Sequence, residues 1–442
     1  MSKDMTRGCT WKLILFFSLP LVIGNIFQQF YSMVDTIIVG RYVSVDALAA
    51  VGATGAVSFL VLGFVIGVTS GFGVIISQRF GAEDENGLKK AVALSIVLSV
   101  VISVVLTIAS VGSTDFMLHL MNTPENIYSD ARTYIIIIFA GVGASVYYNL
   151  IAAILRALGD SKTPLYFLVL SSVINIGLDL LFIIQFKMGV AGAGYATVIS
   201  QLISAVACTF YTFKRYDILK LSKVDFKWDG VYVLNLLKVG LPMAFQFSIT
   251  AIGVMVLQGA LNAFGSGTVA AYTVGSKVEM VVSQPFVALG VTMATFCGQN
   301  LGAGRFDRIK KGVREGMLLC FCACMLAVAC MVFGGPFCVR LFMENPSAEI
   351  VAQAQQYLNT ISVFFVILGL LLLFRNVMQG MGYALLPTLG GVGELAARFV
   401  VSIVLPGIIG YAGICLASPI AWIVAVVPQM IAFFCISKKW TD

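Results

Sequence analysis

Long runs of apolar residues follow one another along almost the whole chain. The stretch from Ala91 to Gly112, for example, contains no charged residue. A helix needs about 20 such residues to cross a hydrocarbon core, whereas barrel strands would alternate apolar and polar residues. Only 11% of the 442 residues are charged, too few to cover a folded surface in water. We therefore predict an all-α integral membrane protein, because helices satisfy their own backbone hydrogen bonds in lipid.

Polar breaks between the apolar runs divide the chain into twelve predicted transmembrane helices. These predicted spans cover residues 13–39, 47–77, 91–113, 131–155, 163–186, 190–213, 239–264, 269–297, 312–335, 350–374, 385–406 and 412–436. The longest of them exceed the thickness of a bilayer, so we expect them to tilt or to project from it.

The positions of the lysine and arginine residues predict the orientation, because cytoplasmic loops are enriched in them. With the N-terminus inside, all but six of the 28 basic residues lie in inside segments. The exceptions are Arg41, Arg132, Lys187, Lys277, Arg340 and Arg398. We therefore predict cytoplasmic N- and C-termini in the inner (plasma) membrane of a cell. This placement explains the net charge of +7 through topology and contact with anionic lipid, so we expect no nucleic-acid partner.

The chain repeats itself at an offset of about 222 residues. Matching pairs are Leu19-Pro20 with Leu241-Pro242, Gln78 with Gln299, Gly81-Ala82 with Gly302-Ala303, Gly159 with Gly382, Pro164 with Pro387, and Gly189 with Gly410. Each half contains six spans, so both have the same orientation about an axis along the membrane normal. We predict two pseudo-symmetric six-helix bundles, residues 1–220 and 221–442, arranged as parallel repeats. Two such bundles can rock about a central cavity, which favours transport by alternating access.

Charged residues inside predicted spans are candidate functional residues, because an ionised side chain in the bilayer centre costs about 2.5–3.5 kcal/mol. In the first span, Gln28, Tyr31 or Ser32, and Asp35 recur at helical spacing and form a polar face. Such a face must lie toward the interior of the bundle. We interpret Asp35 as a cation- or proton-binding residue; the alternative is a buried acid that only fixes helix packing.

The fifth predicted span carries a second polar pair. Asn175 and Asp179 are four residues apart and share one helix face, and Thr197 in the next span can complete the cluster. Amide, carboxylate and hydroxyl oxygens form a hard-oxygen set that suits a sodium ion. Carboxyl groups removed from water can instead carry a proton. The residues leave the choice between Na⁺ and H⁺ open.

Other polar residues in the spans have several interpretations. Glu394 and Arg398, four apart, predict a structural ion pair on one helix. Glu279 is a candidate for a cationic-substrate site or a second proton site. An adaptable cavity for varied organic substrates favours methionine and polar side chains. The candidates for its lining are Gln28, Tyr31, Met33, Gln246, Met255, Glu279 and Met293.

Metal and cofactor chemistry finds little support in the sequence. Four of the ten cysteines, Cys320, Cys322, Cys324 and Cys330, share one apolar run, so we interpret them as small apolar side chains. We find no nucleophile–base pair and no phosphate-binding loop. We therefore expect no enzymatic activity, no cofactor, and no metal beyond a sodium ion at Asp35, Asn175, Asp179 and Thr197.

These features together resemble the multidrug and toxic compound extrusion family over essentially the full length. The residues that carry the resemblance are Leu19-Pro20 with Gln28 and Asp35, Gln78 with Gly81-Ala82, Leu155-Arg156-Ala157-Leu158-Gly159-Asp160-Ser161 with Pro164, Asn175 with Asp179, and Gly298-Gln299-Asn300-Leu301-Gly302-Ala303-Gly304. The resemblance implies a cation site at Asp35, Asn175, Asp179 and Thr197. Glu279 matches an acidic position of the eighth span in many members.

The resemblance implies a secondary active antiporter that exports organic, often cationic, compounds in exchange for Na⁺ or H⁺. We expect small organic substrates, contact with membrane lipid, and function as a monomer. The alternative is a flippase for lipids or lipid-linked precursors. A flippase would need basic residues in the membrane to hold phosphate, and only Arg398 and Lys277 are candidates.

Overall fold

A computed structural model describes residues 4–342 and 347–440. Within these residues, ten helices are long and apolar enough to cross a membrane, and two bent helix pairs bring the number to twelve when each pair counts as one span. This confirms the predicted all-α membrane fold. The chain forms two compact units, the first containing Ile23–Ser248 and the second containing Met5–Val22 and residues 249–440. The division at residue 220 stays a prediction about the two repeats.

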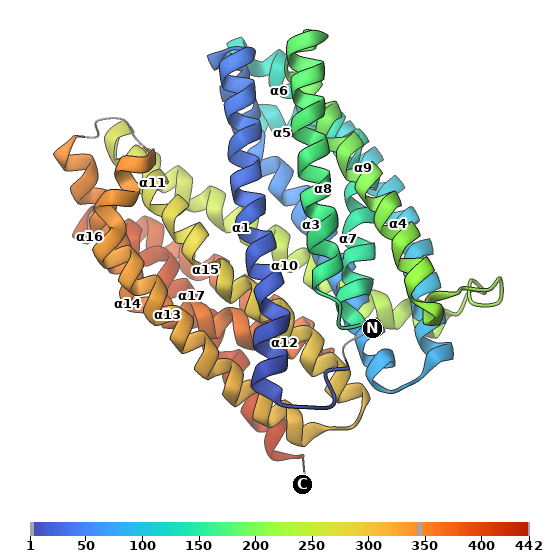
Figure 1. The fold of residues 1–442 in the computed structure, drawn as a ribbon. Coiled ribbons are helices and arrows are strands. Elements are labelled where there is room, and N and C mark those ends of the chain that lie inside the picture. Colours follow the sequence, from blue (N-terminus) through green and yellow to red (C-terminus); the bar gives the residue numbers. More distant parts are fainter. Residues whose placement is uncertain (1–3, 343–346, 441–442) are drawn as a thin grey trace. The chain divides into compact units, whose positions relative to one another are not determined.

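The first unit contains most of α1 and the helices that follow it up to the first part of α10. Their bounds are α1 (Thr10–Tyr42), α2 (Val45–Ala53), α3 (Gly55–Gly81), α4 (Glu85–Gly112), α5 (Thr114–Leu120), α6 (Glu125–Ala140), α7 (Val142–Ala157), α8 (Lys162–Asp179), α9 (Val190–Arg215) and α10 (Gly230–Asn262). Two short turns, η1 (Leu180–Gln185) and η2 (Asp217–Leu219), follow α8 and α9. Figure 1 shows α7, α8 and α9 side by side, and α3 packs against both α4 and α7.

The second unit contains the start of α1, the end of α10 and the remaining helices. These are α11 (Ser266–Val282), α12 (Gln284–Gly302), α13 (Phe306–Phe342), α14 (Ala348–Gly380), α15 (Leu385–Val404), α16 (Pro406–Ile409) and α17 (Tyr411–Lys438). α14 packs against α12, α13 and α17, and α17 packs against α15. A large apolar core includes Phe286, Phe296, Phe365 and Phe374, all almost completely buried.

The segment from Met5 to Gly8 is fixed within the second unit through its backbone groups. The Met5 N–H donates to Gln299 Oε1 at 2.8 Å, and the Met5 carbonyl accepts from Asn300 Nδ2 at 3.3 Å and from Arg308 Nη2 at 3.0 Å. Arg308 also donates to the Gly8 carbonyl at 2.9 Å. The Gln299-Asn300 pair of the repeat motif therefore has a structural role in holding the segment before α1.

Close helix packing in the first unit depends on glycine. A Cβ atom at Gly67 would lie 2.5 Å from the Ala244 Cα, and one at Gly71 would lie 2.4 Å from the Gly240 Cα. Both distances are far below a van der Waals contact, so α3 and α10 approach each other closely only because these side chains are absent. Glycines stand four residues apart on α3 at Gly63, Gly67 and Gly71, a spacing that favours close helix packing.

Three predicted spans are interrupted where the sequence suggested continuous helices. The span 47–77 is divided between α2 and α3 at Thr54. The span 131–155 bends by 47° between α6 and α7, and the span 269–297 bends by 41° between α11 and α12. Pro285 stands at the start of α12, where its missing N–H prevents the hydrogen-bond ladder of α11 from continuing into α12. Hydropathy alone cannot detect such bends because both segments remain apolar.

Asp160 holds the loop that leads into α8. Its carboxylate accepts hydrogen bonds from the backbone N–H groups of Lys162 and Thr163 at 3.0 Å, and from the Thr163 and Tyr216 hydroxyls at 2.6 Å. The preceding Gly159 has a φ of +83°, a conformation that favours glycine. Asp160, which precedes the N-cap residue Ser161, therefore binds the first backbone N–H groups of the helix that carries Asn175 and Asp179.

We expect Asp160→Asn to lower the thermal stability of the protein. Burial alone would raise the pKa of Asp160, but hydrogen bonds from Thr163 and Tyr216 outweigh it, so the pKa lies below its ordinary value. Hydrogen bonds to a charged group contribute about 1.5–3 kcal/mol. This stabilisation is complete above the ordinary pKa of an aspartate and is lost as the pH falls through the lowered pKa of the folded state.

The measurement is thermal unfolding of the purified protein and of the variant over a series of pH values. The difference in Tm should be constant near neutral pH and should shrink only in the acid range. Asp217→Asn is a matched control, because Asp217 is an exposed acid of the segment that follows α9. Equal stability of the wild type and Asp160→Asn at neutral pH would show that Asp160 does not hold the loop.

Candidate functional site

Two aspartates from different helices meet in the first unit. Asp35 lies on α1 and Asp179 is the last residue of α8, and their carboxyl groups share a hydrogen bond. Asp179 is completely buried and Asp35 is partly buried. The Oδ1 atom of Asp35 is buried and meets no hydrogen-bond partner among the described residues. The two acids that sequence patterns identified on separate spans therefore form one pair.

The other predicted members of the cluster lie beside this acid pair. Asn175, one turn before Asp179 on α8, donates from Nδ2 to Thr197 Oγ1 at 3.4 Å. Thr197 on α9 also donates to the Ala193 carbonyl at 3.0 Å and shares a hydrogen bond with Tyr31. Tyr31 stands one turn before Asp35 on α1. The structure thus brings Asp35, Asn175, Asp179 and Thr197 together and adds Tyr31, which the sequence suggested as a cavity residue.

Tyr134 is a member of this cluster that sequence reasoning missed. It lies on α6 and is close enough to Asp35, Asp179 and Tyr31 for direct electrostatic interaction. In the sequence, Tyr134 is a hydroxyl-bearing residue directly before a run of isoleucines, and this alone does not indicate a functional site. A tyrosine beside two carboxyl groups can donate a hydrogen bond to them, so Tyr134 is a further candidate for orienting the acid pair.

The helix that carries Asp179 changes its geometry directly after this residue. Residues 180–185 form η1, a π-helical turn. Single π-helical turns are rare in proteins, and those that occur often lie at functional sites. The wider turn begins at the residue after Asp179, and apolar sequence patterns give no indication of it.

The oxygen atoms of the cluster are of the kind that a cation site requires. Two carboxyl groups in hydrogen-bond contact need a shared proton or a bound cation between them, because two bare negative charges repel each other in a dry environment. The carboxylate, amide and hydroxyl oxygens are ligands that a hard cation accepts. The buried Oδ1 of Asp35 adds an oxygen atom with spare acceptor capacity. The residues present therefore fit either Na⁺ or H⁺.

The predicted lining residues of a substrate cavity occupy different environments. In the first unit, Gln28 and Met33 on α1 are exposed, whereas Gln246 on α10 is buried. In the second unit, Met255 and Glu279 are partly buried. Met293 is completely buried in the apolar core, where its sulfur packs against Gly316. The structure gives no support to Met293 as a cavity residue, because its side chain fills space between helices.

Charged residues also cluster in the second unit. Glu394 on α15 accepts from Arg398 at 2.9 Å and from Arg375 on α14 at 2.7 Å. Glu279 on α11 accepts a hydrogen bond from Tyr357 on α14 and lies near Arg398. Glu394 and Arg398, which the sequence suggested as an ion pair, are in contact, and Arg375 is the additional partner that the spacing on α15 could not reveal.

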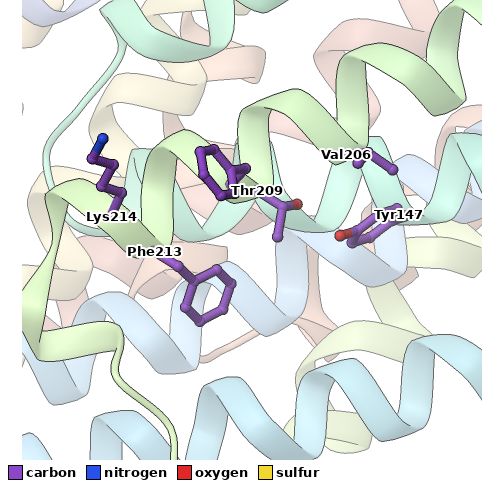
Figure 2. A pocket seen from close by; sticks show the side chains of 6 residues that line it. Tyr147, Val206, Thr209, Phe213 and Lys214 are labelled. Carbon is purple, nitrogen blue, oxygen red and sulfur yellow. The ribbon is translucent and has the colours of Figure 1, made fainter.

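An apolar hollow of about 490 Å³ lies on the first unit between α7 and α9. Figure 2 shows Tyr147 of α7 facing Val206 and Thr209 of α9, with Phe213 and Lys214 farther along α9. Phe210 completes the lining. The hollow contains none of the candidate cation or substrate residues, so we do not assign it to either site.

Comparison with known proteins identifies both repeats. The family model MatE matches the chain twice, over residues 20–181 and 242–404. The probable multidrug resistance protein YpnP of Bacillus subtilis is 30% identical, and the match covers 86% of this chain and 84% of YpnP. The probable multidrug resistance protein NorM of Thermotoga maritima is 26% identical over 85% of this chain and 81% of its own length.

A solved structure has the same fold. It is described as the outward-facing conformation of a multidrug resistance MATE family transporter of the MOP superfamily. The TM-score is 0.92 at 25% identity, and the match covers 99% of this chain and 98% of that structure. The arrangement of helices around the acid pair is therefore that of a known class of membrane transporters.

Proposed function

Because the chain belongs to the MatE family of membrane transporters, we propose that it exports organic, often cationic, compounds in exchange for Na⁺ or H⁺. The similarity to probable multidrug resistance proteins supports this substrate class. We further propose that it works as a monomer in the plasma membrane, with both termini in the cytoplasm. The observation that carries the proposal is the Asp35–Asp179 pair, held by α1 and α8 in the first unit.

In the proposed cycle, the acid pair takes up the coupling cation from outside. The bound cation compensates the repulsion between the two neighbouring carboxylates. Asn175, Thr197 and Tyr31 supply further oxygen atoms around the cation. Loss of the cation restores the repulsion between Asp35 and Asp179. The two charge states therefore favour different arrangements of α1 and α8, and this difference is the origin of coupling.

The exported compound binds to the other arrangement. Cation binding then weakens the binding of the compound, and binding of the compound weakens the binding of the cation, because both shift one two-state equilibrium. The flippase alternative would require basic side chains available for a phosphate group. Of the two candidates, Arg398 already pairs with Glu394 at 2.9 Å, which weakens the flippase alternative.

The experiment that tests this function is transport of a fluorescent organic cation in proteoliposomes under an imposed Na⁺ gradient or an imposed pH gradient, one at a time. We expect one of the two gradients to drive transport, and we expect an ionophore that dissipates this gradient to stop it. Empty liposomes are the control. Transport that neither gradient accelerates, with intact liposomes, would contradict coupled antiport.

A further inference from the structure

The repeat can be aligned residue by residue through the helices that form the cation site. The matching prolines of α1 and α10, Pro20 and Pro242, are 222 residues apart. Pro164 and Pro387, near the starts of α8 and α15, are 223 residues apart, and so are the first residues of these two helices. This alignment assigns a counterpart in the second unit to each site residue that α1 or α8 carries in the first.

The counterparts reverse the charge of the site. The positions that correspond to Asp35 and Asp179 hold Leu257 and Ser402, so neither carboxylate is repeated. The position that corresponds to Asn175 holds Arg398. The first unit thus has two acids where the second has a guanidinium group and no acid at the matched positions.

Two other counterparts indicate how this guanidinium is accommodated. Tyr31 corresponds to Gly253, and a Cβ atom at Gly253 would lie 2.6 Å from Arg398 Nη1. The guanidinium therefore lies against the backbone of α10, in space that a side chain at this position would require. Tyr134 corresponds to Tyr357, since α6 and α14 begin 223 residues apart, and both tyrosines lie beside an acid.

The charges around Arg398 balance within the second unit. Arg398 and Glu394 are each only 5% exposed, and Arg398 Nη2 donates to Glu394 Oε1 at 2.9 Å. Arg375 Nη2 donates to the other oxygen of Glu394 at 2.7 Å. Glu279 lies near Arg398 and accepts from Tyr357. Counted as ionised, two arginines and two glutamates sum to zero, which suits a site withdrawn from water.

We propose that Arg398 is a resident cation, which fills the second unit's counterpart of the coupling site so that the chain takes up its coupling ion in the first unit alone. This inference rests on the proposed function of the Asp35–Asp179 pair. It assigns Arg398 a role in setting the number of ions exchanged. An arginine with a purely structural role would fix the packing of α15 but would have no effect on ion binding.

Removal of the guanidinium is predicted to create an ion site. Glu394 would keep Arg375, whereas Glu279 would lose the charge that compensates it. A buried carboxylate without a compensating charge is costly, so it must take up a cation or a proton. In the Arg398→Asn variant, position 398 also carries the same amide side chain that Asn175 provides in the first unit.

The test uses the full-length chain, purified in detergent, with the first-unit site removed by Asp35→Asn and Asp179→Asn. Ion binding is measured by the signal that the wild type gives, either equilibrium binding of radioactive Na⁺ or proton release after an upward pH step. We expect the double variant to lose this signal. Addition of Arg398→Asn should restore about one ion per chain, and Arg398→Gln should give the same gain if the Asn variant folds poorly.

Two controls separate charge from packing. Arg398→Lys keeps the positive charge and should restore no binding in the double variant. Glu279→Gln, added to the Arg398→Asn protein, should abolish the gain. If the Arg398→Asn and Arg398→Gln proteins are monodisperse but bind no additional ion, the inference about Arg398 is wrong, whereas the proposed coupling site is unaffected. Full ion binding by the Asp35→Asn, Asp179→Asn variant would instead overturn the proposed coupling site itself.

Discussion

Substitution of Asp35 or Asp179 by asparagine is expected to reduce ion-driven efflux to the level of liposomes without protein. The two carboxyl groups share a hydrogen bond in the first unit, and the proposed cycle depends on their change of charge. Asparagine keeps the shape and the hydrogen-bonding capacity of the side chain but can neither lose a proton nor balance a cation. The measurement is transport of the fluorescent cation under the gradient that drives the wild type.

Asp115→Asn provides the matched control for these variants. Asp115 forms an ion pair with Arg132 at 2.6 Å, and both side chains are about half exposed, so its charge can be removed without disturbing a buried pair. This control should transport like the wild type. Asp35→Asn and Asp179→Asn should both yield monodisperse protein, because each substitution relieves repulsion between two acids. Driven efflux at the wild-type rate in both variants would refute the assignment of the coupling site.

The fold and much of the site could be predicted because the membrane restricts the choices. Backbone groups without water must pair within a helix, so apolar runs translate directly into spans. The same restriction makes Asp35 and Asp179 conspicuous, since a carboxyl group in an apolar run requires a compensating partner. Asn175 shares a helix face with Asp179, and this local spacing was enough to place it in the same cluster.

The residues that escaped prediction depend on contacts between helices distant in the sequence. Tyr134 joins the acid pair from α6, and Arg375 joins Glu394 from α14. Neither residue lies three or four positions from another polar member of its cluster on the same helix, so spacing alone could not assign it. Met293 illustrates a different ambiguity, because a methionine is equally suited to a cavity wall and to a packed core, and here it is buried and packs against Gly316. The π-helical turn after Asp179 likewise depends on geometry that hydropathy does not encode.

The coupling ion and the exported compound are expected to weaken each other's binding by the same factor. Each ligand stabilises a different arrangement of one protein, so the free energy of coupling between them is a single quantity. Such couplings are typically about 1–3 kcal/mol, which corresponds to about 5- to 150-fold in affinity. We therefore expect saturating ion to raise the Kd of a fluorescent organic cation by a factor within this range.

The measurement is a pair of equilibrium titrations on purified protein in detergent. One titrates the compound at zero and saturating ion, and the other titrates the ion without compound and with saturating compound. Asp179→Asn should bind the compound with an affinity that no longer responds to the ion, because the group that distinguishes the two arrangements has lost its charge. Competition at one shared site would instead raise the apparent Kd without limit as the ion concentration increases, whereas coupling between two sites reaches a plateau. A plateau in the wild type that persists unchanged in Asp179→Asn would show that coupling originates outside the acid pair.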